Sequence, residues 1–254
     1  MQPDRTRGVF ETLRVVNGEV QALEAHVKRL ESSLRELYGQ PLPSEALARL
    51  HATYARDAPR GAVQRMRIDV EPRDGRLGVA IAVDAARPDI TAPVALAPVT
   101  LPGGLGAHKW RDRSLLDSLG SDPVPLLVDE DGSVLEAAWA NVWTLRGQRL
   151  TTPPASGRIL AGVTRALLLE RASALGLTAT EQPIMFDELR AADAIVLTSS
   201  VRLAVAAGLG APPATEPAVV ATIRAALARS IAAVRQAPRE PHRPAHLREQ
   251  RAGA

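Results

Sequence analysis

Lysine is scarce in this chain of 254 residues, and its scarcity draws attention to the two positions where it remains. Of the 31 basic residues, only Lys28 and Lys109 are lysines. Arginine keeps its charge at neutral pH, whereas a buried lysine can lose its proton and attack a carbonyl carbon. Lys28 lies in a helical pattern beside Arg29, where an exposed side chain is the ordinary outcome. Lys109 follows a glycine-rich stretch and is the stronger candidate for a reactive amine.

Groups that would complement a reactive amine occur in four other segments. Glu136 places a carboxylate near the end of an apolar predicted strand, 133–137, and Arg29 lies in the first helical pattern. The segment 162–164 begins a strong helical pattern, whose first amides can bind a phosphate. Segment 198–200 ends another apolar strand with three hydroxyl groups. An amine, a carboxylate, an arginine and hydroxyl-bearing turns are what a phosphorylated aldehyde cofactor, pyridoxal 5′-phosphate, requires.

Composition and motif searches argue against other chemistries. The absence of cysteine removes disulfides, thiolate nucleophiles and cysteine-ligated metals. The five histidines have no metal-ligand spacing, so we expect no metal. No glycine-rich phosphate loop follows a strand, and no serine lies in a G-x-S-x-G elbow.

Charge and hydropathy exclude two classes of partner. The formal net charge is +3, and segment 236–254 contributes +2 of it through four arginines and two glutamates. The rest of the chain is nearly neutral, which gives no electrostatic basis for binding nucleic acid. No apolar run approaches the roughly 20 residues that span a membrane. The first ten residues lack the apolar core of a signal peptide, so we expect a cytoplasmic protein.

Hydrophobic periodicity predicts an α/β (α+β) protein with two domains. The first is a smaller α+β domain, 1–101, with an antiparallel sheet and two helices. A linker, 102–108, leads to a larger α/β domain, 109–235, and a disordered basic tail, 236–254. The strands are predicted at 8–16, 19–23, 63–70, 76–83, 93–100, 124–128, 133–137, 141–145, 149–152 and 194–198, and the helices at 25–38, 44–58, 110–119, 162–175 and 217–234.

Six motifs, in order along the chain, resemble those of one enzyme family. They are GVFETLRVVNGEV, HVKRL, HKWRDR, VLEAAWANVWTL, TTPPASGRILAGVTR and TSSVR. From about Gly8 to about Ala207, the chain resembles the fold-type IV, or class IV aminotransferase-like, pyridoxal-phosphate enzymes. The resemblance implies the two-domain fold of that family, a homodimer, and pyridoxal 5′-phosphate as the cofactor.

The resemblance also implies a role for each residue at a matching position. Lys109 would hold the cofactor covalently and then move the proton, and Glu136 would pair with its pyridine nitrogen. Leu160 would pack against the face of the cofactor ring. The phosphate would be bound by Arg29, the Val163 amide, Thr164, Ser200 and Ser199.

The residues around Lys109 favour a lyase among the activities of this family. Ser114 stands where branched-chain aminotransferases usually carry a tyrosine, and Asp112–Arg113 resembles an Asn-Arg pair of 4-amino-4-deoxychorismate lyases. The Ser-Val-Arg stretch 200–202 resembles Ser-Leu-Arg of the lyases. Arginines suit a substrate with two carboxylates. The expected substrate-binding residues are Thr12, Arg14, Arg113 and Arg202.

Two departures from the family pattern keep alternatives open. Only MQPDRTRG precedes the first motif, so we expect the family's first strand to be missing, and Ala206–Ala207 replaces a usual Pro-Val. The first hypothesis is a lyase that eliminates pyruvate from 4-amino-4-deoxychorismate to give 4-aminobenzoate for folate synthesis. The second is a branched-chain or D-amino-acid aminotransferase, and the third is a binding protein without catalytic activity on the same scaffold.

Overall fold

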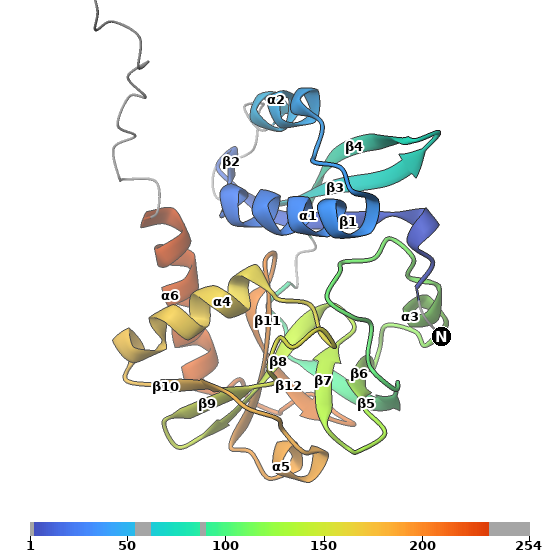
Figure 1. Ribbon diagram of the computed structural model, residues 1–254. Coiled ribbons are helices and arrows are strands. Elements are labelled where there is room, and N and C mark those ends of the chain that lie inside the picture. The colour runs from blue at the N-terminus through green and yellow to red at the C-terminus, as the bar shows by residue number, and fades with distance from the viewer. Residues whose placement is uncertain (1–2, 54–61, 87–89, 234–254) are drawn as a thin grey trace, which may run out of the picture.

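The computed structural model describes residues 3–53, 62–86 and 90–233 and contains two sheets (Figure 1). The smaller sheet is antiparallel throughout, in the order β2-β1-β3-β4. Its two hairpin turns contain Asn17–Gly18 and Asp74–Gly75, all with positive φ, as tight hairpins require. The elements of this part are β1 (Val9–Val16), β2 (Glu19–Val20), α1 (Leu23–Tyr38), α2 (Ser44–Thr53), β3 (Val63–Arg73) and β4 (Arg76–Ala85).

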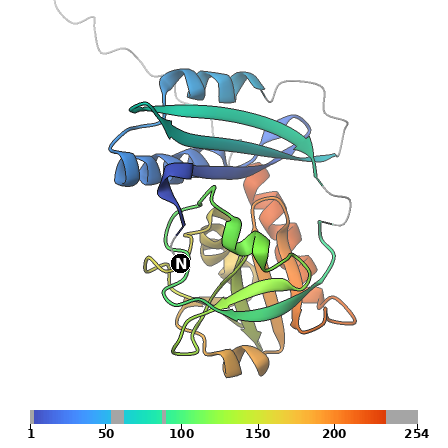
Figure 2. The ribbon, with the colours of Figure 1, turned by 90° about the vertical axis from the view of Figure 1, so that its right-hand side faces the viewer.

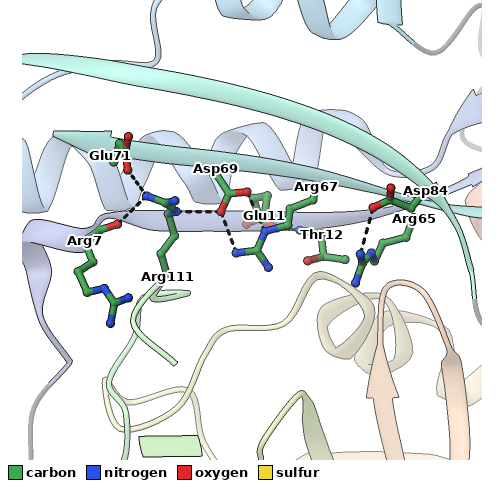
Figure 3. Close-up of polar contacts among 9 residues, drawn as sticks. All are labelled: Arg7, Glu11, Thr12, Arg65, Arg67, Asp69, Glu71, Asp84 and Arg111. Carbon is green, nitrogen blue, oxygen red and sulfur yellow. Dashed lines mark hydrogen bonds and ion pairs between the residues drawn. The ribbon is translucent and has the colours of Figure 1, made fainter. Parts of the chain in front are cut away.

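Alternation along β1 and β3 gives the smaller sheet two different faces. Leu13 of β1 and Ile68 of β3 are fully buried with Leu30 and Leu34 of α1, because the helices α1 and α2 pack on this face. The alternate residues, including Thr12 and its register partner Arg67, lie on the opposite face. Figure 3 shows these side chains pointing away from the helices, toward the second half of the molecule.

The larger sheet closes on itself, because β7 pairs with both β6 and β8. The ring runs β8-β11-β12-β5-β6-β7, and β9 and β10 extend the sheet beyond β8. Apolar side chains of the ring strands form one buried cluster, with Leu126, Val142, Leu197 and Val205 fully buried. The strands are β5 (Val94–Thr100), β6 (Val124–Val128), β7 (Val134–Ala137), β8 (Ala140–Arg146), β9 (Arg149–Thr152), β10 (Thr178–Glu181), β11 (Ala194–Ser199) and β12 (Leu203–Leu209).

Helices cover one side of this sheet, as Figures 1 and 2 show. Leu168 of α4 and Ile223 of α6 are buried in a cluster with Trp143 and Val196 of the sheet. Within the described ranges, no helix has the length and apolar character needed to cross a bilayer. The helices are α3 (Ser114–Ser118), α4 (Val163–Arg171), which continues as a 3₁₀ turn (Ala172–Leu175), α5 (Phe186–Arg190) and α6 (Ala218–Ala233), and a 3₁₀ turn (Arg5–Arg7) precedes β1.

The structure corrects three sequence predictions. Residues 110–113 are not helical, because Trp110 forms a β-bridge with Val9 and the helix begins only at Ser114. Strand β5 belongs to the larger sheet, where it pairs with β6 and β12, so the chain changes sheet before residue 94 instead of at the predicted boundary after 101. Strands β10 and β12 and helix α5 were not predicted. The predicted helical residues 54–58 and the tail 236–254 lie outside the described residues.

Candidate active site

A cavity of about 600 Å³ is lined by residues from both sheets and from the loops between them. Nearly all the residues that the sequence singled out meet here, although they are spread over about two hundred positions of the chain. Those that line the cavity are Thr12, Arg29, Lys109, Arg113, Glu136, Leu160, Val163, Thr164, Ser199, Ser200 and Arg202.

Lys109 is held beside β1 by main-chain hydrogen bonds. The amide of Phe10 donates to the Lys109 carbonyl over 2.8 Å, and the amide of Arg111 donates to the Gly8 carbonyl over 3.0 Å. The Lys109 ammonium nitrogen lies 4.7 Å from the centre of the Phe10 ring. Burial, with a further contribution from the charge of Arg29, lowers the pKa of Lys109 to about 8. An appreciable fraction of this amine is therefore neutral, and nucleophilic, near physiological pH.

Glu136 is a buried carboxylate on β7, with 7% of its surface exposed. Burial raises its pKa to about 7, although the amide of Leu160 donates a hydrogen bond of 3.3 Å to Oε2 and favours the ionised form. Such a carboxyl can share or hold a proton near neutral pH. It is suited to a partner that is itself a protonated nitrogen.

The start of α4 supplies main-chain donors to the same cavity. The amides of Val163 and Thr164 lie in the first turn of the helix and therefore have no intrahelical partner. Gly162 precedes the helix and has no side chain that could cap these amides. A Cβ at Gly162 would lie 1.9 Å from Oδ1 of Asn141, and Nδ2 of Asn141 donates to the Leu160 carbonyl over 2.8 Å. Asn141 therefore holds the loop before the helix and leaves room only for glycine. Helix-start amides of this kind bind anions such as phosphate.

Arg29 reaches the cavity from α1 and is fixed by a buried carboxylate. Its Nε and Nη2 donate to the two oxygens of Glu11 over 2.7 and 2.8 Å, and Nη1 donates to the Ala161 carbonyl over 2.9 Å. These contacts use three of the five guanidinium donors, so two remain to bind an anion beside α4. Glu11 also accepts a hydrogen bond of 2.8 Å from Nδ1 of His26. Arg29 and His26 hold the pKa of Glu11 far below its ordinary value, although burial opposes them.

A comparison with known protein families gives a decisive match. The sequence pattern of the family described as class IV amino-transferase matches residues 8–208, most of the chain. The chain belongs to the class IV aminotransferase family. The enzymes of this family depend on pyridoxal 5′-phosphate, and this member is accordingly a pyridoxal-phosphate-dependent enzyme.

Individual relatives within the class IV family carry different activities. An aminodeoxychorismate lyase from Bacillus subtilis (strain 168) is 28% identical over 218 residues, which are 76% of this chain and 74% of the relative. A D-alanine aminotransferase from Bacillus licheniformis is 25% identical over 219 residues, 76% of this chain and 75% of the relative. The solved fold IV transaminase from Curtobacterium pusillum aligns with a TM-score of 0.74 at 26% identity, over 89% of this chain and 85% of that chain.

The residues of this class IV enzyme fit the cofactor. An amine of lowered pKa, a buried carboxyl, and a cradle of helix amides, Arg29 and hydroxyl groups line one cavity. A phosphate needs such a cradle, and a pyridine nitrogen needs an acid partner. Pyridoxal 5′-phosphate acts as an electron sink when it is bound.

Arg14 is the one predicted site residue that does not line the cavity. Its Nη1 donates to the main-chain carbonyl of Val201, so the guanidinium is engaged beside the cavity. Arg14 is thus placed behind the cavity wall, and its contact with the substrate stays a prediction. Its register partner on β3, Arg65, lines the cavity in its place.

Two cavity arginines of β3, Arg65 and Arg67, were not predicted from the sequence. Arg65 forms an ion pair of 3.1 Å with Asp84 (Figure 3). Arg67 lies with its guanidinium carbon 3.9 Å from the centre of the Phe10 ring. Both oxygens of the Asp69 carboxylate accept hydrogen bonds of 2.8 Å from the guanidinium group of Arg67. The only sequence signal was their alternation with the buried apolar residues of β3. In a chain so rich in arginine, that signal did not distinguish them from surface residues.

A second network ties the segment after Lys109 to the smaller sheet. Arg111 donates to Asp69 over 2.9 Å, to Glu71, and to the Arg7 carbonyl over 3.0 Å (Figure 3). Asp112 accepts from Nη1 of Arg7 over 3.0 Å. These contacts hold the segment before β1 against the segment that carries the reactive lysine.

Replacing Glu136 by glutamine is expected to stabilise the cofactor-free protein at pH 8. The folded protein must ionise this carboxyl at a pKa of about 7, against an ordinary value of 4.5, so the native state loses stability as the pH rises from 4.5 to 7. The glutamine variant avoids this cost and should raise the free energy of unfolding at pH 8 by about 2 kcal/mol. At pH 4.5 the two proteins should have nearly the same free energy of unfolding. Urea unfolding at both pH values measures the difference.

Glu130→Gln provides the control for this experiment, because Glu130 is exposed on the turn before β7. The free energy of unfolding of that variant should differ little from that of the original protein at either pH. A Glu136→Gln variant that is less stable at pH 8 would show that ionised Glu136 has favourable partners that outweigh its burial.

Proposed function

We propose that this enzyme eliminates pyruvate from 4-amino-4-deoxychorismate and yields 4-aminobenzoate. The observation that carries the proposal is the cavity wall, which presents six cationic side chains and two carboxylates, Asp112 and Glu136. Three of the six cations also pair with carboxylates behind the wall. The substrate has two carboxylates, and each can be bound by a guanidinium through two parallel hydrogen bonds. The similarity to an aminodeoxychorismate lyase supports the same reaction.

Arg113 and Arg202 are proposed to bind the substrate carboxylates. Arg113 donates to the Ala138 carbonyl over 2.8 Å, and Arg202 lies 4.5 Å from the centre of the Trp139 ring. These contacts fix both guanidinium groups at the wall of the cavity. Thr12 lies on the cavity face of β1 and is proposed as a substrate contact or proton relay.

The cofactor-binding roles extend the proposal to the cradle. Lys109 holds the cofactor through its amine, Glu136 pairs with the pyridine nitrogen, and Leu160 packs against the ring. The electron sink that the cofactor supplies stabilises negative charge on the carbon next to the substrate nitrogen. The phosphate is bound by Arg29, the amide of Val163, Thr164, Ser199 and Ser200.

Lys109 performs the proton transfer in this reaction. With the substrate held by the cofactor, the released Nζ of Lys109 would act as a neutral base beside the carbon that bears the substrate amine. Nζ takes the proton from this carbon, the bond to the enolpyruvyl oxygen breaks, and the ring becomes aromatic. The leaving group departs as the enolate of pyruvate and gains a proton at its methylene carbon to become pyruvate. The lowered pKa of Lys109, about 8, matches the role of a base near neutral pH.

Transamination is the second candidate, because a D-alanine aminotransferase matches a similar share of the chain. In both reactions Lys109 would move the proton and Glu136 would pair with the pyridine nitrogen. A branched-chain or D-amino acid brings one carboxylate, and so would leave part of the cationic wall unused in the amino-acid half of that reaction.

Product analysis separates the two reactions. The enzyme, supplied with pyridoxal 5′-phosphate, is incubated with 4-amino-4-deoxychorismate, and 4-aminobenzoate and pyruvate are quantified. A lyase should form them in equal amounts, and Lys109→Ala should form neither above background. A parallel incubation contains 2-oxoglutarate with L-leucine or D-alanine. Glutamate without 4-aminobenzoate would overturn the lyase proposal in favour of transamination.

We also propose that the enzyme is a cytoplasmic homodimer, as the resemblance implies and as a chain without cysteine permits. Size-exclusion chromatography with light scattering would give twice the chain mass of 27.0 kDa. A mass of one chain would contradict the dimer.

A further inference from the structure

A continuous chain of hydrogen bonds leads from the buried carboxylate of β1 to the start of α4. Nδ1 of His26 lies 2.8 Å from Oε2 of Glu11, and its Nε2 lies 3.0 Å from Oγ of Ser200. Oγ1 of Thr164 donates to Oγ of Ser200 over 3.5 Å. His26 and Glu11 are each 1% exposed, so this chain is closed off from water at the Glu11 end. It opens to the cavity at the two hydroxyl groups.

Donor and acceptor counting fixes where the protons lie. Ionised Glu11 can only accept, so Nδ1 of His26 must carry a proton and donate it. In a neutral imidazole, Nε2 is then an acceptor, and the hydroxyl of Ser200 must donate to it. Burial and the charges of Arg29 and Lys109 hold the pKa of His26 below its ordinary value, which favours the neutral ring. The hydroxyl proton of Ser200 is therefore committed to His26, and that of Thr164 to Ser200.

This arrangement conflicts with the role of Ser200 as a phosphate ligand. A phosphate dianion accepts hydrogen bonds and offers no proton to donate at pH 8. If Ser200 turns its single proton toward a phosphate, Nε2 of His26 loses its donor in a buried place. A buried acceptor without a partner costs about 1–3 kcal/mol. A proton on Nε2 removes that cost, because the imidazolium then donates to Ser200 and to Glu11 at once.

We propose that His26 is a positioning residue that takes up one proton at Nε2 when the cofactor phosphate binds, and so releases the hydroxyl of Ser200 to the phosphate. This inference rests on the proposed phosphate site at Ser200. The charged groups that face His26 are Glu11 from β1, Arg29 from α1, and Lys109. The proton comes from solvent, and the new imidazolium lies between the Glu11 carboxylate and the incoming dianion. Both neighbours favour its charge.

Calorimetry of the binding of pyridoxamine 5′-phosphate tests the proposal without a covalent step or turnover. Titration of the cofactor-free enzyme at pH 8, in buffers of different ionisation enthalpy, counts the protons taken up. The original enzyme should take up about one proton more than His26→Gln, because the amide cannot be protonated. Pyridoxamine, which lacks the phosphate, should show no such difference between the two proteins. His108→Gln is the control, because His108 borders the cavity but pairs with Ser33 and Glu36.

Nitrogen NMR of the imidazole rings gives a second readout that needs no variant. The His26 ring should change from a neutral ring protonated at Nδ1 to an imidazolium when pyridoxamine 5′-phosphate is added. Two results would overturn the inference and leave the proposed phosphate site standing. One is an equal number of protons taken up by the original enzyme and by His26→Gln, and the other is a His26 ring that stays neutral while pyridoxamine 5′-phosphate binds. If the phosphate adds nothing to the affinity over pyridoxamine, the proposed phosphate site fails and the inference fails with it.

Discussion

Replacing Lys109 by alanine is expected to lower kcat/KM by about 10³-fold or more, which corresponds to about 4 kcal/mol of lost transition-state stabilisation. Lys109 supplies both the amine that holds the cofactor and the base that moves the proton, and no other lysine lines the cavity. The variant should also leave no protein-bound cofactor after borohydride reduction and denaturation. Product formation and the absorbance of the denatured protein measure the two effects.

Lys28→Ala is the matched control, because Lys28 is the chain's other lysine and is exposed on α1. Its removal should change kcat/KM by less than about twofold, since surface substitutions away from a site have small effects. Comparable activity losses in the two variants, or an active Lys109→Ala enzyme, would contradict the role given to Lys109.

The largest effect on stability is expected for Glu11→Gln. The change leaves Arg29 without its carboxylate partner, and it takes the charged acceptor from buried His26. Removing one partner of a buried charge pair costs about 3–5 kcal/mol of stability. We expect the lower end of this range, about 3 kcal/mol, because Arg29 keeps its hydrogen bond to the Ala161 carbonyl. Urea unfolding at pH 7 should show this loss in the free energy of unfolding.

The pH dependence of this loss has a definite sign. The pKa of Glu11 is far lower in the folded protein than its ordinary value of 4.5, so its stabilisation is full above pH 4.5 and is lost as the pH falls below it. The difference in the free energy of unfolding between the original protein and the Glu11→Gln variant should therefore become smaller as the pH falls below 4.5. Glu31→Gln breaks the surface pair of Glu31 with Arg35 on the same helix and should cost less than about 1 kcal/mol. A similar small cost for Glu11→Gln would show that the buried network contributes little.

The sequence predicted the elements whose apolar period is strong and whose turns are marked by glycine. Both hairpins of the smaller sheet and helices α1, α4 and α6 follow from such patterns. Strand β12 was missed because three of its seven residues are alanine and no turn signal precedes it, and Leu203 begins it at positive φ. The segment 110–113 was predicted as helix because its main-chain pairing with β1 is a long-range contact that no local pattern records.

The site shows the same division between local and long-range information. The six motifs contain the eleven predicted site residues that line the cavity. Some of these residues lie at a strand end or helix start, whereas Thr12 and Arg29 lie within β1 and α1. Glu11 and His26 were not given roles, although Glu11 lies on the buried face of β1 together with Val9 and Leu13. A carboxylate on an apolar face is a signal of a buried ion pair. Its partners on α1 could not be identified from the sequence alone.

Mass spectrometry of a borohydride-reduced digest tests most directly whether Lys109 binds the cofactor. The enzyme is saturated with pyridoxal 5′-phosphate, reduced and cleaved, and the peptides that contain Lys28 and Lys109 are compared. Reduced cofactor should be attached to Lys109, with Lys28 unmodified. An unmodified Lys109 peptide from saturated enzyme would contradict the covalent role on which the proposed reaction depends.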